Sequence, residues 1–271
     1  MKMITLKGGL QMPIIGFGTW QLEPETCYQA VTEALKIGYR HIDTAKVYDN
    51  ESAVGKAITE SGIPRSEIFL TTKLWKDFLK KEYIKSECKA SLDRLNQPYV
   101  DLYLIHWPNK EVPIKETLEV LDELKQKGLI KSFGVSNFTI HHLQDVLKTG
   151  FDIVNNQVEF HPTLYQKDLI DFCQTNDIAV TAYSPIGQGR DIKLAPILNL
   201  AEKYQRSPAQ VVISWINSKN VIAIPRSSNP QNIANNIKAS EWQLEPEDIA
   251  VIDKLNEDYR VCFPDFNEFN Y

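Results

Sequence analysis

The chain of 271 residues carries 30 Lys and Arg against 35 Asp and Glu, which gives a formal net charge of −5 at pH 7. Hydrophobic residues make up 43% and charged residues 24%, ordinary globular usage that argues against a disordered or fibrous chain. Nucleic-acid binding needs a clustered positive excess, which this sequence lacks, so we expect no nucleic-acid partner. The sequence also has no run of eighteen apolar residues, so we expect no membrane span.

The four cysteines, Cys27, Cys88, Cys173 and Cys262, lie far apart in the sequence. Scattered cysteines in a chain of this size are typical of a reducing compartment, where they pack as small buried hydrophobic residues. The N-terminal segment lacks the apolar stretch of a secretory signal. We therefore expect a cytoplasmic protein, with a monomer as the default assembly.

Short apolar runs alternate with amphipathic segments along the chain. Residues 6–10 predict a hairpin turn, and apolar positions at helical spacing from Cys27 to Ala34 predict the first helix. Ser207, followed by a proline at the first helical position, predicts another helix start. Further helices are predicted at residues 54–58, 231–239 and 247–255. The predicted strands are residues 14–17, 40–43, 69–73, 100–106, 133–136, 153–158, 179–183 and 221–224.

The spacing of these strands is about that of a βα unit, roughly 30 residues. Eight such units favour a (β/α)₈ barrel over an open doubly wound sheet, although periodicity alone leaves the open sheet as an alternative. We expect one domain over residues 1–271, with the hairpin near residues 6–10 plugging the bottom of the barrel and an extra C-terminal helix.

Three ionisable residues end predicted strands: Asp43, Lys73 and His106. Chemistry in a barrel lies at the C-terminal strand ends, and strand parity allows all three side chains to point into the mouth. Tyr48 follows Asp43 by five residues. Each alone has a structural explanation, such as an ion pair or a core histidine, but together on one rim they favour a catalytic site.

The chemistry of these four residues suggests proton donation. A free phenol has a pKa of about 10, too high for efficient transfer near neutral pH, and the Lys73 ammonium would lower the pKa of Tyr48. Asp43 would keep Lys73 charged and in place. A neutral His106 would join the Tyr48 hydroxyl in binding an oxygen that gains negative charge.

Six segments, in this order, resemble the signatures of the aldo-keto reductase family. They are Gly16-Phe17-Gly18-Thr19-Trp20, Gly38-Tyr39-Arg40-His41-Ile42-Asp43-Thr44-Ala45 with Tyr48, Thr72-Lys73-Leu74-Trp75, Asp101-Leu102-Tyr103-Leu104-Ile105-His106-Trp107-Pro108, Gly134-Val135-Ser136-Asn137-Phe138 and Ile224-Pro225-Arg226-Ser227. The resemblance covers nearly the whole chain. Residues 48–51 and the short loop after His106 are most similar to bacterial 2,5-diketo-D-gluconate reductases, which also reduce methylglyoxal.

The resemblance implies an NADP-dependent oxidoreductase that reduces aldehydes, methylglyoxal-like dicarbonyls or keto-sugars. Tyr48 would be the proton donor, Lys73 would lower its pKa, Asp43 would hold Lys73, and His106 would orient the carbonyl. NADPH would deliver the hydride, with NADH as the alternative. The G-x-G-x-x-G dinucleotide fingerprint is missing, because Gln21 stands at its third glycine; the family binds the dinucleotide across a barrel mouth instead.

The resemblance also implies how the cofactor is held. Ser136, Asn137 and Gln157 would bind the nicotinamide carboxamide, Tyr183 would stack on the ring, and residues 184–189 would line the pyrophosphate. The expected cofactor-binding residues are Gly18, Thr19, Trp20, Asp43, Ser136, Asn137, Gln157, Tyr183, Ser184, Pro185, Gly187, Gly189, Pro225, Arg226, Ser227, Ser228, Asn232, Asn235 and Asn236.

Preference for NADPH depends on Arg226 and Ser227, since a guanidinium binds a ribose 2′-phosphate bidentately. One departure weakens this preference: Asn232, Asn235 and Asn236 stand where the family commonly has an arginine and a Glu-Asn pair.

The expected substrate-contacting residues are Trp20, Tyr48, Trp75, His106 and Trp107. We expect Phe263 to join this apolar wall, with core packing as the alternative for Trp75 and Phe263. The short segments after His106 and after Leu255 predict an open mouth suited to small carbonyl substrates. We expect no metal site: His141 and His142 are adjacent and diverge on a helix, and His161-Pro162 is expected in a loop.

Other functions remain as alternatives. A barrel of this family can act as a cofactor-sensing regulatory protein or a structural lens protein, and a phosphate-binding barrel isomerase is a rival enzyme. The intact set Asp43, Tyr48, Lys73 and His106 favours catalysis. Ser184 lacks a G-x-S-x-G elbow, and the stretch after the last strand has no glycine, which disfavours hydrolase and isomerase chemistry.

Overall fold

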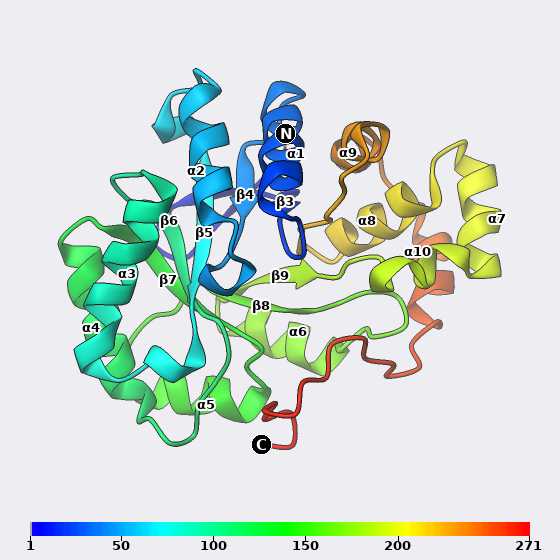
Figure 1. Cartoon of the computed structure of the whole chain (residues 1–271). Helices are drawn as coiled ribbons and strands as arrows, with labels where there is room; N and C mark the ends of the chain where they lie inside the picture. The colour runs from blue at the N-terminus through cyan, green and yellow to red at the C-terminus, as the bar shows by residue number, and fades with distance from the viewer. Residues whose placement is uncertain (1) are drawn as a thin grey trace.

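The computed structural model describes residues 2–271, and its centre is a sheet of eight parallel strands surrounded by helices (Figure 1). Each strand pairs with the next in chain order. The strands are β3 (Phe17–Gly18), β4 (His41–Asp43), β5 (Phe69–Leu74), β6 (Val100–Ile105), β7 (Ile130–Ser136), β8 (Asn155–Glu159), β9 (Ala179–Tyr183) and β10 (Ile222–Ala223).

The first and last strands of the sheet close on each other. Ile15 forms a parallel bridge with Ala223, and the backbone N–H of Gly16 donates to the Ala223 carbonyl at 2.8 Å. Gly18 continues this contact toward Pro225 at 3.2 Å, and a Cβ at Gly18 would lie 2.8 Å from the Ile224 carbonyl oxygen. The expected (β/α)₈ barrel is therefore confirmed, and the open sheet is excluded.

Helices pack outside the barrel, and each of the five helices predicted in the sequence analysis has a counterpart among them. The face of α1 that contains Cys27, Ala30, Val31 and Ala34 is buried, and Ser207 and Gln210 form the expected capping box. The helices are α1 (Pro24–Lys36), α2 (Glu51–Glu60), α3 (Lys81–Leu95), α4 (Ile114–Gln126), α5 (Ile140–Lys148), α6 (Lys167–Thr175), α7 (Ala195–Tyr204), α8 (Pro208–Ser218), α9 (Pro230–Ile237) and α10 (Pro246–Asp253).

The described residues form two more α-helices than the eight strands of the barrel require at one helix per strand. The long interval between β9 and β10 holds both α7 and α8, of which the sequence predicted only the second, and α10 is the expected extra C-terminal helix. The 3₁₀ helices are η1 (Lys46–Tyr48), η2 (Arg65–Glu67), η3 (Lys76–Phe78), η4 (Gly187–Gly189), η5 (Asp191–Lys193) and η6 (Lys238–Glu241). No helix within residues 2–271 is long and apolar enough to cross a membrane.

The N-terminal hairpin pairs β1 (Met3–Thr5) with β2 (Gln11–Pro13) in antiparallel register. Gly8 and Gly9 have φ of +88° and +90°, a conformation that glycine adopts without strain. Leu6 and Met12 are buried, and Lys7 contacts Asp152, just before β8, at 2.7 Å. The hairpin therefore lies at the N-terminal end of the barrel, opposite the strand ends that carry the candidate site.

Candidate active site

A cavity of about 550 Å³ lies at the C-terminal ends of the strands, where barrel enzymes place their chemistry. Most of the residues selected from the sequence line this cavity. They are Gly18, Thr19, Trp20, Asp43, Tyr48, Trp75, His106, Trp107, Ser136, Asn137, Gln157, Tyr183, Ser184, Pro185, Gly189 and Arg226.

Lys73 lies beneath the cavity, fully buried, with its ammonium between three oxygen atoms. Its Nζ donates to Asp43 Oδ1 at 2.6 Å and to the Thr44 carbonyl at 2.9 Å, and it lies 3.2 Å from Tyr48 Oη. The second Asp43 oxygen accepts from Gln157 Nε2 at 2.6 Å. A buried ion pair is tolerated when such additional hydrogen bonds satisfy both partners, so the geometry keeps Lys73 charged beside the phenol.

The titration of Tyr48 and Lys73 reflects burial and their mutual contact. Burial raises the pKa of Tyr48 above its ordinary value, and the Lys73 charge opposes that rise. The net direction differs from the lowered pKa expected from the sequence, although the effect of Lys73 has the expected sign. Burial also disfavours the charged form of Lys73, but its contacts with Asp43 and Tyr48 outweigh this and raise the pKa of Lys73.

His106 faces the same cavity as Tyr48. Its ring meets the Tyr48 ring edge-on at 5.7 Å between centroids and the Trp75 ring at 5.3 Å. Burial, and then the charge of Lys73, hold the pKa of His106 well below its usual range. His106 is therefore neutral near pH 7 and can donate one N–H to an oxygen in the cavity.

The loop that carries Tyr48 is fixed by the residues after it. The Asn50 amide donates to the carbonyls of Thr19 at 2.8 Å and Leu22 at 3.0 Å, and its oxygen accepts from the Thr44 hydroxyl at 2.9 Å. Asp49 has a φ of +54°, which turns the chain from η1 into α2. These buried side-chain hydrogen bonds fix the loop, and the loop in turn holds the phenol over Lys73.

The three residues expected to bind a carboxamide are joined to one another at the ends of β7 and β8. The Ser136 hydroxyl donates to the Gln157 carbonyl at 2.8 Å, and Asn137, at a φ of +64°, donates to the His106 carbonyl at 3.0 Å. The Tyr183 hydroxyl donates to Asn137 Oδ1 at 2.7 Å. Asn137 and Gln157 thus form a wall of amides at the cavity, and the Asn137 hydrogen bond connects this wall to the His106 backbone.

The chemistry of the lining suits a nicotinamide dinucleotide that carries a 2′-phosphate. Ser136, Asn137 and Gln157 supply neutral amide and hydroxyl groups, and Arg226 lines the same cavity without forming an ion pair with any residue between 2 and 271. A free guanidinium beside neutral donors matches the needs of such a ligand. Within that same range, no group of three or more His, Cys, Asp or Glu side chains is arranged to hold a metal ion.

Some residues that the sequence selected do not line the cavity. Among them, Lys73 lies directly beneath the cavity floor. Ser227 instead hydrogen-bonds with the backbone of Asn229, which caps α9, and Asn236 is buried. The expected cofactor-binding residues absent from the lining are Gly187, Pro225, Ser227, Ser228, Asn232, Asn235 and Asn236.

The sequence missed the contribution of the C-terminal tail. Phe263 is 64% exposed and does not line the cavity, whereas Phe266 does, with its ring 5.5 Å from that of Trp75 and 5.4 Å from that of Trp107. The tail therefore covers part of the mouth that was expected to be open. Ile186 and Gln188 also line the cavity, from the 184–189 segment that the sequence selected as a whole. The lining residues that the sequence did not select are Gln21, Val47, Ile224, Cys262, Pro264 and Phe266.

Comparison with known proteins identifies relatives over nearly the full chain. The model of the Aldo/keto reductase family matches residues 14–191 and 193–257. Glyoxal reductase from Bacillus subtilis is 41% identical over 95% of this chain and 94% of its own. Methylglyoxal reductase DkgB from Escherichia coli O157:H7 is 38% identical over 94% and 97% of the two chains. Glycerol 2-dehydrogenase (NADP(+)) from Saccharomyces cerevisiae is 40% identical over 99% and 96%.

A solved structure agrees with this assignment. An aldo-keto reductase from a Medee basin deep-sea metagenome library superimposes with a TM-score of 0.94 at 36% identity, covering 99% of this chain and 100% of that one. The family model and these relatives extend over the barrel strands and the cavity that the strands build. The chain belongs to the aldo/keto reductase family.

Proposed function

We propose that this chain is an NADPH-dependent carbonyl reductase that converts aldehydes, methylglyoxal-like dicarbonyls or keto-sugars to alcohols, with Tyr48 as the proton donor. The observation that carries the proposal is the 3.2 Å contact between Lys73 Nζ and Tyr48 Oη, in a cavity that also contains His106. The whole chain acts as one catalytic unit.

Tyr48 and His106 act together on the carbonyl oxygen of the substrate. The neutral His106 ring donates its N–H to that oxygen and orients it, while the phenol donates the proton as the oxygen gains negative charge. Because burial raises the pKa of Tyr48, the phenol is protonated at neutral pH and has a proton to give. The Lys73 ammonium then stabilises the phenolate left behind, at close range and out of water.

A reduced nicotinamide, when bound, would supply the hydride. Ser136, Asn137 and Gln157 would hold its carboxamide, and Tyr183 would stack on its ring. Ser184, Pro185 and Gly189 would follow the pyrophosphate, and Arg226 would bind the 2′-phosphate. The guanidinium that no described residue pairs with supports NADPH over NADH, as does the relative named for NADP(+).

The substrate class follows from the wall around Tyr48 and from the relatives. Trp20, Trp75 and Trp107 line the cavity and offer apolar faces to a small carbonyl compound. Relatives named for the reduction of glyoxal and methylglyoxal support short dicarbonyls. The four free cysteines fit a protein of a reducing compartment such as the cytoplasm.

The decisive experiment mixes the purified protein with methylglyoxal and follows the absorbance of NADPH, with NADH in a parallel reaction. We expect turnover with both nucleotides at saturation but a higher KM for NADH. Cofactor binding without turnover on any aldehyde or ketone of a broad panel would overturn the proposal and favour a cofactor-sensing protein on the same fold.

A further inference from the structure

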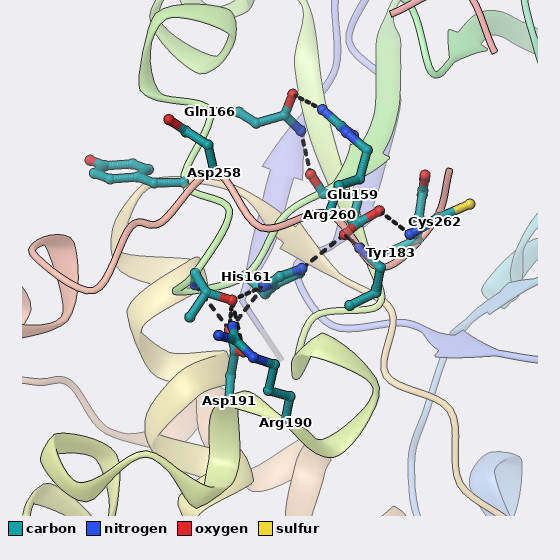
Figure 2. A network of polar contacts seen from close by, with 12 residues as sticks. Glu159, His161, Gln166, Tyr183, Arg190, Asp191, Asp258, Arg260 and Cys262 are labelled. Carbon is teal, nitrogen blue, oxygen red and sulfur yellow. Dashed lines mark hydrogen bonds and ion pairs between the residues drawn. The ribbon is translucent and has the colours of Figure 1, made fainter. Parts of the chain in front are cut away.

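His161 lies fully buried between two fully buried carboxylates at the mouth of the barrel. Its Nε2 is 2.9 Å from Glu159 Oε1, and its Nδ1 is 2.9 Å from Asp191 Oδ2. Figure 2 shows the imidazole between the two acids, with dashed contacts on both sides. The sequence placed this histidine in an ordinary loop, and the reaction proposed above does not use it.

Only a protonated imidazole can donate to both acids at once, because a neutral ring has one N–H and one lone pair. Burial works against the charged ring, but the contacts with Asp191 and Glu159 outweigh it and raise the pKa of His161. The Thr163 hydroxyl adds a 2.9 Å bond to Asp191. The three charged groups together carry one net negative charge, stabilised by hydrogen bonds on every side.

Glu159 connects this cluster to the C-terminal tail. Its carboxylate accepts from the backbone N–H of Val261 at 2.6 Å and of Cys262 at 2.8 Å. Arg260 adds a second connection, because its guanidinium donates to Gln166 at 3.1 Å and Gln166 donates to the Glu159 carbonyl. From this tail, Cys262, Pro264 and Phe266 form one wall of the active-site cavity.

Asp191 connects the cluster to the loop after β9. A Cβ at Gly187 would lie 2.6 Å from Asp191 Oδ1, so the loop packs directly on this carboxylate at a point where only glycine fits. Residues 184–186, 188 and 189 line the cavity from this loop. Arg190 adds a further contact to the tail through Glu257 at 2.6 Å.

We propose that His161 is a positioning residue that joins these two walls, the 184–191 loop and the 257–266 tail, and thereby sets how tightly and how long the dinucleotide is held. The proposal rests on the proposed function, since it assumes that the dinucleotide lies along this loop. His161 acts through Glu159 and Asp191 and does not itself line the cavity.

The test begins with His161→Gln, which retains one donor but turns an oxygen toward one of the two carboxylates. We expect the NADPH dissociation rate, measured by stopped-flow fluorescence, to rise about tenfold and the Kd to rise with it, while kcat/KM for methylglyoxal at saturating NADPH changes less. Hydrogen exchange at the Val261 and Cys262 amides should accelerate, because these N–H groups are bonded to Glu159.

The rescue variant combines His161→Gln with Asp191→Asn. The Gln amide then donates to Glu159 and its oxygen accepts from the Asn amide, and the cluster again has one net negative charge. We expect this pair to recover most of the NADPH affinity and of the amide protection. The matched control is Asp101→Asn, a buried carboxylate at the start of β6 that contacts Arg65, far from the mouth; it should leave the NADPH dissociation rate unchanged.

Alkaline pH supplies an independent readout on the unaltered protein. The charged and titratable groups around the ring and its two acids are Glu159, Asp191, Tyr183, Arg190, Glu257, Arg260 and Cys262. The pKa of His161 is raised in the folded protein. The stabilisation from its charged contacts is therefore fully present below the pKa of the unfolded histidine, and it is lost as the pH rises through the pKa of the folded one. Tail protection should therefore fall on the alkaline side in the wild type, but not in the rescue variant.

Unchanged exchange at Val261 and Cys262 in His161→Gln, or an NADPH dissociation rate within about twofold of wild type, would overturn the proposal. If His161→Gln does not fold, the rescue variant gives the test. The proposal would be overturned if the rescue variant folds and its Val261 and Cys262 amides still lose protection at alkaline pH. A wild-type protein that does not bind NADPH would defeat the proposed function, and the amide readout would still decide whether His161 joins the two walls.

Discussion

The side-chain amide of Gln157, at β8, donates a 2.6 Å hydrogen bond to Asp43, at β4. These strands are not neighbours in the sheet, so the bond crosses the barrel interior. Since the other Asp43 oxygen binds Lys73, the carboxylate is committed on both sides. Asp43 thereby links Lys73, which we propose activates the phenol, to the wall of amides that we propose faces the cofactor.

This arrangement predicts a large loss of stability for Asp43→Asn. The change leaves the buried ammonium of Lys73 without its counter-charge, and breaking one partner of a buried pair costs about 3–5 kcal/mol. Urea unfolding measures the loss. The matched control is Asp152→Asn, which removes the acid from the more exposed Lys7–Asp152 pair and should lower the free energy of unfolding far less, because water and salt screen an exposed pair. Equal losses in the two variants would contradict the role given to Asp43.

Tyr48→Phe should remove the proton donor and leave the cofactor site in place. The phenol oxygen contacts Lys73, and none of the expected carboxamide-binding residues hydrogen-bonds to it. We expect kcat for methylglyoxal to fall by roughly 10²–10⁴, with an NADPH Kd within about twofold of wild type. Steady-state kinetics and fluorescence titration give the two values. A Phe variant that retains most of the activity would rule out Tyr48 as the proton donor.

The pH dependence of the reaction should reflect the neutral state of His106. Its pKa lies well below the ordinary value, so we expect kcat/KM for methylglyoxal, which does not itself titrate there, to stay flat from pH 7 to about 5.5. A drop centred near the ordinary histidine pKa would contradict this assignment.

The low pKa of the buried histidines should also make the folded protein less stable as the pH falls. A histidine whose folded pKa is depressed contributes stability that is present above its unfolded pKa and is lost as pH falls toward the folded value. Burial, and then Lys73, lower the pKa of His41 to about 3, and His106 shifts in the same direction. Unfolding free energies measured between pH 7 and 4 should therefore fall less steeply in His106→Gln than in the wild type.

Arg226→Ala should distinguish the two nicotinamide cofactors. The guanidinium lines the cavity, and losing a charge-assisted bond to a phosphate costs about 1.5–3 kcal/mol, or roughly 10- to 100-fold in binding. We expect the KM for NADPH to rise by this factor while the KM for NADH changes little. Lys238→Ala, which removes an exposed cation at the end of α9, is the matched control. Similar use of both nucleotides by the wild type would contradict a 2′-phosphate site.

The barrel and its rim were predictable because local patterns specify them. The almost continuously apolar run from Val100 and the capping box at Ser207 are local signals, and the structure confirms both. The rim residues meet because closing the barrel brings all strand ends together. The 263–266 segment lacks periodicity, and its position is set by distant contacts between Glu159 and the Val261–Cys262 backbone. Nothing local indicated that Phe266 rather than Phe263 would face the cavity.

These two tail aromatics give the final prediction. Phe266 packs edge-on against Trp75 and Trp107 at the cavity, so Phe266→Ala removes an aromatic face worth about 1 kcal/mol to a ring-bearing substrate, roughly a fivefold rise in KM for benzaldehyde. Methylglyoxal is too small to need that face, and its KM should change little. Phe263→Ala is the matched control, since that side chain is 64% exposed and contacts Phe269. A larger effect from Phe263→Ala would show that the tail adopts another arrangement when substrate is bound.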